Sequence, residues 1–164
     1  MIAGLRTRIA DGADLRRLTT YACSDSDDPW EIDAQEIIRD VGHAGLVPGR
    51  ECIVVSSPDA GDVPIAVLVF ERYDRFSDSV YYVVSMGTTN HRKGLGRRMF
   101  SYLLEILGSR LGSGTTIYLT ALIHVRNRCA YEFWRSLFPE SVELSPAEGS
   151  SKIYTEMSVP IELA

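Results

Sequence analysis

A glycine-bearing basic segment, residues 91–98, holds the residue types best suited to binding a phosphorylated ligand. Gly94 and Gly96 stand one residue apart, just before a run in which apolar residues recur at helical spacing. Glycine lets the backbone approach a ligand closely, and the first N–H groups of a helix have no partner within it. Those groups and the helix dipole favour a phosphate or pyrophosphate. Four basic side chains add positive charge: Arg92, Lys93, Arg97 and Arg98.

Two well-known phosphate motifs do not fit this segment. A P-loop needs GxxxxGK[ST], which is absent. The dinucleotide fingerprint GxGxxG lacks its third glycine, because Met99 stands at that place. A basic loop before a helix is also common as a turn with solvated charges, so the segment alone indicates an anion site without naming its ligand.

Hydrophobic periodicity predicts the elements that must position this segment. The expected strands are residues 5–9, 52–55, 65–72, 80–86, 115–125, 142–144 and 152–159. The expected helices are residues 14–22, 31–41, 97–108 and 127–137, the first of them capped by Asp14. The three strands between residues 52 and 86 have short turns and predict an antiparallel meander. This order predicts one mixed α+β domain over residues 1–164.

Composition limits the functional classes that are open. Of the 164 residues, 17 are Lys or Arg and 22 are Asp or Glu, giving a net charge of −5. Such a chain is a poor candidate for binding nucleic acid or anionic membranes. The three cysteines lack metal-site spacing, so we expect reduced thiols and no metal. No stretch approaches the roughly 20 apolar residues of a membrane span, and no secretory signal is evident, which predicts a cytoplasmic protein.

Two motifs together resemble the GNAT superfamily of N-acetyltransferases. The family's acetyl-CoA-binding motif, (Arg/Gln)-x-x-Gly-x-(Gly/Ala), is similar to His91-Arg92-Lys93-Gly94-Leu95-Gly96. Its Asn-x-x-Ala motif, which is followed by an aromatic residue, is similar to Asn127-Arg128-Cys129-Ala130 with Phe133 and Trp134. The expected element order resembles that of the family over nearly the full length.

The resemblance implies a mostly antiparallel sheet of about seven strands, flanked by about four helices. The fourth and fifth strands would splay apart to admit the pantetheine arm of acetyl-CoA. On this resemblance the residues that bind acetyl-CoA are Val84, Ser85, Met86, His91, Arg92, Lys93, Gly94, Leu95, Gly96, Arg97, Asn127 and Trp134.

The sequence departs from the family at three places. His91 replaces the usual Arg or Gln but still donates a hydrogen bond. Leu137-Phe138-Pro139 replaces x-Gly-Phe, which alters how the chain leaves the expected helix 127–137. Trp134 stands where many relatives have a tyrosine thought to protonate the leaving thiolate, and an indole N–H does not act as an acid near neutral pH.

The implied reaction is direct attack of an amine on the thioester, with no covalent enzyme intermediate. The amine must lose a proton to a base, and a backbone N–H near Met86 is the candidate donor to the oxyanion. We expect His124 as the base, since its ordinary pKa is suitable, and Tyr131 as the acid. Glu71, Tyr82, Ser85 or a water chain remain alternative bases, and each named side chain could equally be structural.

The acceptor is specified only as a primary amine of a small molecule or peptide. The acidic segment 25–31, which includes Trp30, suits a cationic amine or is a solvated loop. The main alternative function is a CoA-binding regulatory module of the same fold with weak or no catalysis. A toxin acting on charged tRNA and direct nucleic-acid binding are both disfavoured by the net charge of −5. Monomer and homodimer remain open.

Overall fold

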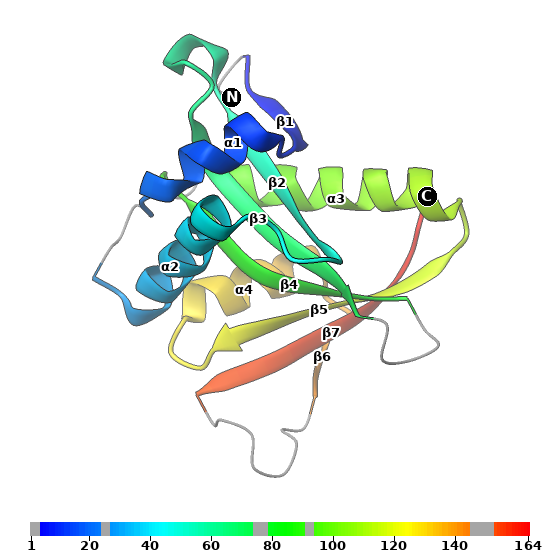
Figure 1. Ribbon diagram of the computed structural model, residues 1–164. Coiled ribbons are helices and arrows are strands. Elements are labelled where there is room, and N and C mark those ends of the chain that lie inside the picture. The colour runs from blue at the N-terminus through cyan, green and yellow to red at the C-terminus, as the bar shows by residue number, and fades with distance from the viewer. Residues whose placement is uncertain (1–3, 24–26, 74–78, 91–93, 145–152) are drawn as a thin grey trace.

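The computed structural model describes residues 4–23, 27–73, 79–90, 94–144 and 153–164 (Figure 1). Its strands are β1 (Arg6–Ile9), β2 (Arg50–Ser56), β3 (Pro64–Tyr73), β4 (Val80–Thr88), β5 (Thr116–His124), β6 (Val142–Leu144) and β7 (Tyr154–Glu162). Its α-helices are α1 (Gly12–Arg17), α2 (Pro29–Ala44), α3 (Leu95–Leu111) and α4 (Arg128–Leu137). Two short 3-10 turns, η1 (Leu18–Thr20) and η2 (Pro58–Ala60), complete the described elements.

The described strands form one sheet in the order β1-β2-β3-β4-β5-β7-β6. Every neighbouring pair is antiparallel except β4 and β5, which are parallel. A parallel pair needs a long crossover, and α3 supplies it between these two strands (Figure 1). The predicted α+β architecture, with its meander of β2, β3 and β4, is therefore confirmed.

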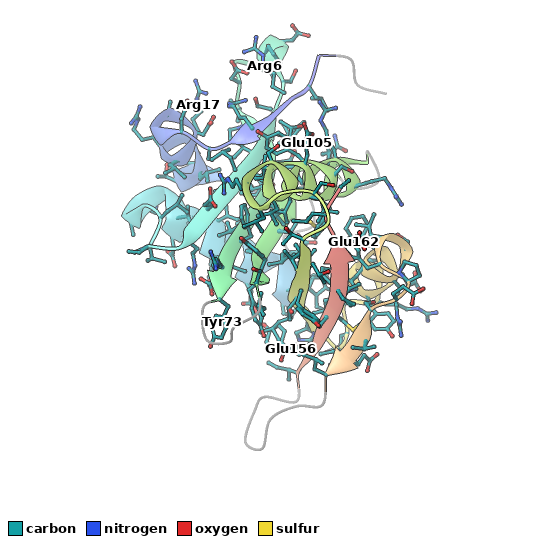
Figure 2. All side chains as sticks on the ribbon, turned by 90° about the vertical axis from the view of Figure 1, so that its right-hand side faces the viewer. Arg6, Arg17, Tyr73, Glu105, Glu156 and Glu162 are labelled. Carbon is teal, nitrogen blue, oxygen red and sulfur yellow. The ribbon has the colours of Figure 1, made fainter. Side chains whose placement is uncertain are left out.

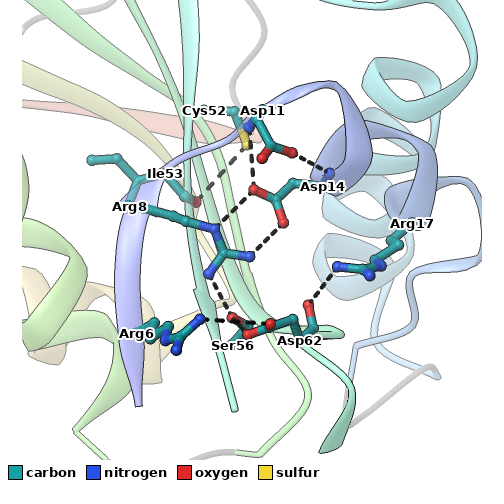
Figure 3. Close-up of polar contacts among 9 residues, drawn as sticks. All are labelled: Arg6, Arg8, Asp11, Asp14, Arg17, Cys52, Ile53, Ser56 and Asp62. Atoms are coloured by element: carbon teal, nitrogen blue, oxygen red, sulfur yellow. Dashed lines mark hydrogen bonds and ion pairs between the residues drawn. The ribbon is translucent and has the colours of Figure 1, made fainter. Parts of the chain in front are cut away.

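The predicted start of the first helix at Asp14 is wrong, because Asp11 is the N-cap of α1. The Asp11 carboxylate accepts from the Asp14 N–H at 2.8 Å, and the Asp14 carboxylate accepts from the Asp11 N–H at 3.1 Å. This reciprocal pair satisfies two free donors at the helix start. Asp14 is buried and also binds the Arg8 guanidinium at 2.5 and 3.0 Å (Figure 3). It therefore joins α1 to β1 as well as completing the cap.

Two hydrophobic cores lie on opposite faces of the sheet. On one face, α1, η1 and α2 cover the central strands, and Leu18 of η1 and Ile38 of α2 share a buried cluster with Val67 of β3. On the other, α3 and α4 pack through residues such as Leu103 and Phe100 (Figure 1). The central strands are buried on both faces, which is why they are rich in valine rather than alternating.

The α2 side of β5, β7 and β6 is less covered than the rest of the sheet. Leu122 of β5 lies opposite Glu156 of β7, which lies opposite Leu144 of β6, so the three side chains share a face. Leu122 is 54% exposed and Leu144 is 41% exposed. Among the described helices, none is both long and apolar enough to cross a membrane.

Candidate functional site

β4 and β5 separate where a β-bulge interrupts β4. The two strands pair only from Val80 opposite Tyr118 to Val83 opposite Ala121, although β4 continues to Thr88 and β5 to His124. Against β3, the register shifts so that residue 84 is the extra residue between two paired neighbours. A bulge bends its strand and increases the local twist. The bulge therefore directs β4 away from β5, and the predicted splay of the fourth and fifth strands is confirmed.

A cavity of about 270 Å³ lies at this separation. It is bordered on one side of the sheet by residues of α3 and α4, including Phe100, Phe133 and Trp134. On the other side it is bordered by residues of α2 and β7, including Trp30 and Tyr154. Because both faces contribute to one lining, the cavity passes through the sheet between β4 and β5.

A larger hollow of about 530 Å³ lies elsewhere, between α3 and the end of β7. Its charged lining residues are Glu105 and Glu162 (Figure 2). None of its lining residues comes from β4, from the start of α3 or from α4. We therefore place the candidate site at the separation of β4 and β5, which Asn127, Ala130, Phe133 and Trp134 of the second sequence motif border.

The β4 wall of the cavity consists of Val83, Val84, Ser85 and Met86. Within the described part of the sheet, β5 pairs with β4 only as far as Val83, so the β5-facing edge is open beyond it. An open strand edge can bind an extended ligand through backbone hydrogen bonds. Ser85 is buried, and its hydroxyl donates to the Ala34 carbonyl at 3.3 Å, which fixes α2 against this wall.

The start of α3 has the geometry expected for an anion site. Gly94 is the N-cap, in the left-handed region at φ 72°, and it has no side chain that could cap the helix. The N–H groups of Leu95, Gly96 and Arg97 belong to the first turn, where no intrahelical partner exists. The predicted ligands His91, Arg92 and Lys93 lie outside the described residues.

Gly96 and Arg98, near the start of α3, have contacts that hold neighbouring elements together. A Cβ added at Gly96 would lie 2.7 Å from Cζ of Phe133, so glycine allows α3 and α4 to approach closely. Arg98, which the sequence grouped with the anion site, instead donates to the Thr7 hydroxyl at 2.5 Å and the Leu5 carbonyl at 2.7 Å. Its guanidinium therefore holds β1 against α3.

On the α4 wall, Asn127 and Trp134 both border the cavity. Asn127 caps α4, its side-chain oxygen accepting from the Ala130 N–H at 3.0 Å. Trp134 is only 3% exposed, and its indole N–H has no hydrogen-bond partner among the described residues. An unpaired buried donor is costly, by about 1–3 kcal/mol, so this N–H is suited to meet an acceptor atom of a ligand.

The structure brings one of the two predicted catalytic residues to the cavity. His124 borders it, and its Nδ1 accepts from the Arg126 N–H at 3.1 Å. Tyr131 is not among the lining residues, and its hydroxyl donates to the Glu143 carboxylate at 2.8 Å. In this geometry Tyr131 contacts β6 rather than the cavity.

The alternative bases have other partners. The Glu71 carboxylate accepts from the Arg50 guanidinium at 2.9 Å, and the Tyr82 hydroxyl donates to Glu156. Neither Glu71 nor Tyr82 borders the cavity, whereas Ser85 does. The described residues contain no group of three or more His, Cys, Asp or Glu side chains that could hold a metal ion.

Two residues at the α2-side opening were not identified from the sequence. Asp33 and Tyr154 border the cavity, and the Tyr154 hydroxyl donates to Asp33 Oδ2 at 3.0 Å. Burial and then this hydrogen bond raise the pKa of Tyr154. Asp33 could have been identified, since it lies three residues after Trp30 and hence on the same helical face. Tyr154 could not, because it is 121 residues from Asp33 and only the folded sheet brings it near.

Solved structures resemble this architecture, although no protein-family model matches the sequence and the curated proteins contain no significant match. The ribosomal-protein-S18-alanine N-acetyltransferase from Escherichia coli has a TM-score of 0.67 at 15% identity, covering 98% of this chain and 96% of that one. An acetyltransferase of the GNAT family from Staphylococcus aureus has a TM-score of 0.67 at 9% identity, covering 95% and 98%.

A third similar structure contains coenzyme A. The NatC complex bound to Gag peptide and CoA has a TM-score of 0.64 at 9% identity, covering 96% of this chain and 98% of that chain. Identities this low establish similarity of fold, and the coverage extends over nearly the whole length of each chain. The resemblance inferred from the two motifs is thus confirmed in three dimensions: this chain has the fold of the GNAT-superfamily N-acetyltransferases.

Proposed function

We propose that this protein transfers an acetyl group from acetyl-CoA to a primary amine of a small molecule or peptide. The observation that carries the proposal is the cavity that passes through the sheet at the β4 bulge. A thioester entering from the α3 and α4 side and an amine entering from the α2 side could meet there. Holding two reactants together supplies a large part of the catalysis that such a transfer needs.

The residues around the cavity fit acetyl-CoA. The open edge of β4 at Val84, Ser85 and Met86 offers backbone groups to the amides of the pantetheine arm. The first N–H groups of α3, from Leu95 to Arg97, suit the pyrophosphate, and His91, Arg92 and Lys93 precede them in the sequence. The unpaired Trp134 N–H offers one more donor inside the cavity. Asn127 would border the arm from the α4 side.

The proposed reaction balances with one proton released by the amine and one taken up by the thiolate. The neutral amine attacks the thioester carbon, the new C–N bond forms, and the C–S bond breaks. A backbone N–H of β4 near Met86 would stabilise the oxyanion. A thiol of ordinary pKa, near 8.5, leaves readily as a thiolate and can be protonated afterwards by water. The absence of a tyrosine at position 134 is therefore compatible with turnover.

His124 as the base and Tyr131 as the acid would each have to break a hydrogen bond before taking part in the reaction. In the described structure the His124 Nδ1 lone pair already accepts the Arg126 N–H, so His124 would take a proton there only when that bond opens. Tyr131 would reach the thiolate only if its hydroxyl left Glu143. A water chain from the amine to the α2-side opening would need neither of these contacts to break, and it is the simplest route for the proton.

The test is calorimetric titration with acetyl-CoA of the wild type, Gly94→Glu and the control Gly61→Glu. Both glycines have φ 72°, and a Cβ built at either meets no atom within 4 Å. The two variants therefore carry the same backbone strain and added charge, but only Gly94 lies at the start of α3. We expect binding by the wild type and Gly61→Glu and none by Gly94→Glu. A folded wild type that does not bind acetyl-CoA would overturn the proposal.

A CoA-binding module with little catalysis is the second candidate function. It is supported by Trp134 in place of the family's tyrosine and by the hydrogen bond that holds Tyr131 to Glu143. Release of free CoA thiol with a panel of primary amines separates the two functions. Turnover above the rate of solvent hydrolysis supports the enzyme, while tight binding without turnover supports the module.

A further inference from the structure

Four side chains form a ring at the α2-side opening of the cavity. The Trp30 and His124 rings have centroids 5.2 Å apart, and those of His124 and Tyr154 are 5.5 Å apart. The Tyr154 hydroxyl donates to Asp33, and Asp33 lies one helical turn after Trp30 on α2. The ring thus combines three aromatic side chains with one carboxylate, drawn from α2, β5 and β7, and all four border the cavity.

The chemistry of this ring suits an alkylammonium group. Aromatic faces attract a cation by about 0.5–2 kcal/mol, and a carboxylate adds a charge-assisted hydrogen bond. Tyr154 occupies Asp33 Oδ2, while no donor in the described part of the chain is recorded for Oδ1. In that same part, no Lys or Arg forms an ion pair with Asp33. One carboxylate oxygen is therefore oriented by Tyr154, and the other can accept from a ligand.

A cation bound at this ring would not be the amine that reacts. The attacking nitrogen must be neutral, and a neighbouring carboxylate favours the protonated form by raising the pKa of an amine. The thioester carbonyl is expected at the open edge of β4, whereas Asp33 is an exposed residue of α2. Apolar side chains that could contact methylene groups also line the cavity, among them Ala34, Ile37 and Leu122.

We infer that the acceptor is an alkyl diamine, whose second nitrogen binds as an ammonium in the ring of Trp30, Asp33, His124 and Tyr154. The inference rests on the proposed acetyl transfer and specifies its substrate class. One amine of the diamine is neutral and reacts at β4, and the other remains charged at Asp33. Arg126, whose backbone N–H donates to His124, is exposed, so the charge of its side chain can be screened by solvent.

The kinetic test compares each diamine with the monoamine of equal chain length, using 1,4-diaminobutane with butylamine and 1,3-diaminopropane with propylamine. A hydrogen bond to a charged group corresponds to roughly 10- to 100-fold in affinity. We therefore expect wild-type kcat/KM to be higher for the diamine by that factor, mainly through a lower KM. In Asp33→Asn the ratio of kcat/KM for the diamine to kcat/KM for the monoamine should fall to about one.

The matched control is Asp40→Asn, since Asp40 is also exposed on α2 but does not border the cavity. It should keep the preference of the wild type for the diamine. Tyr154→Phe keeps the aromatic side chain at position 154 but removes the hydroxyl that orients Asp33. We therefore expect a partial loss of the preference for the diamine. Equal kcat/KM for both amines in the wild type, or a preference that survives in Asp33→Asn, would overturn the inference.

A binding experiment distinguishes failure of this inference from failure of the proposed function. Calorimetric titration of the wild type with 1,4-diaminobutane should show binding that Asp33→Asn loses and Asp40→Asn keeps, whether or not turnover occurs. If acetyl-CoA binds and monoamines react as well as diamines, only the diamine inference fails. If acetyl-CoA does not bind, the acetyltransferase proposal fails, and the diamine titration still decides whether the ring binds an ammonium.

Discussion

The Tyr82 hydroxyl on β4 donates a hydrogen bond to the Glu156 carboxylate on β7, across the intervening strand β5. The residue of β5 between them is Thr120, which lies opposite Tyr82 and opposite Ser158. The Thr120 and Ser158 hydroxyls are themselves hydrogen-bonded at 3.1 Å. These contacts link three strands beside Val83 and Ala121, the last residues that pair before β4 and β5 separate, so they hold the closed end of the cavity.

Replacing Tyr82 with Phe should destabilise the fold, because it removes the hydroxyl and keeps the aromatic ring of residue 82. The lost hydrogen bond leads us to expect a decrease of about 1–2 kcal/mol in the free energy of unfolding, measured by denaturant titration. Tyr118→Phe is the control, because Tyr118 is an exposed tyrosine of β5 and should change stability by less than about 0.5 kcal/mol. Equal stability of the two variants would show that the Tyr82 contact contributes nothing.

The same tyrosine should contribute to the loss of stability at alkaline pH. Burial first, and then the hydrogen bond to Glu156, raise the pKa of Tyr82 above its ordinary value. The folded state then retains the phenol proton at a pH where the unfolded chain, with a pKa of about 10, has lost it. Stability must therefore fall as the pH rises above about 10. Burial also raises the pKa of Tyr21, so Tyr82→Phe should make this fall shallower without removing it.

Adding a methyl group at Gly96 should disturb the contact between α3 and α4. The new Cβ would lie 2.7 Å from Cζ of Phe133, so we expect Gly96→Ala to lower stability by about 1–3 kcal/mol. The affinity for acetyl-CoA should also fall, since Phe133 borders the cavity. Gly12→Ala is the control, because its nearest neighbour is an arginine side chain at 3.5 Å. Adding Phe133→Leu to Gly96→Ala should restore part of the stability. If Gly96→Ala alone were as stable as the wild type, the packing argument would be contradicted.

Replacing Trp134 with Phe should separate ligand binding from stability. Removing the unpaired N–H should stabilise the fold, whereas the smaller side chain leaves a gap that destabilises it. We therefore expect the free energy of unfolding to change by about 1 kcal/mol or less. If the N–H donates to acetyl-CoA, its loss should weaken calorimetric binding about tenfold. Phe138→Leu alters a buried aromatic of the same cluster that does not border the cavity, and it should lower stability but keep the affinity. Unchanged affinity in Trp134→Phe would show that the indole N–H does not bind acetyl-CoA.

The three free cysteines should differ in reactivity. Burial raises the pKa of Cys23 and of Cys52 to about 12, while Cys129 is exposed. Near pH 8 only on the order of one in ten thousand of the buried thiols is a thiolate, the reactive form. A thiol reagent should therefore modify Cys129 quickly in the native protein and reach Cys23 and Cys52 only after unfolding. Mass spectrometry of the labelled chain identifies the sites, and rapid labelling of either buried thiol would contradict their burial.

Local patterns in the sequence were sufficient to predict the order of the elements, and they placed the start of α3 at residue 97, two residues after its observed start at Leu95. Gly94 ends a loop before an amphipathic run, and Asn127 precedes another, so both helix starts depend on residues close in the chain. The error at the first helix has a local cause as well. Asp11 and Asp14 are both good capping residues, and the choice between them depends on the partner that Asp14 finds in Arg8 of β1.

The geometry of the candidate site was decided only by the tertiary structure. Residue 84 is one of several β-branched residues in β4, and it becomes the bulge because of the register that β3 imposes, which no local pattern reveals. Asp33 and Tyr154 meet because α2 packs beside a sheet in which β7 is a neighbour of β5. The sequence by itself therefore determined which residues could bind a phosphorylated ligand and the elements that carry them. Strand register and helix packing, which join residues distant in the chain, decided where β4 opens and which side chains surround the opening.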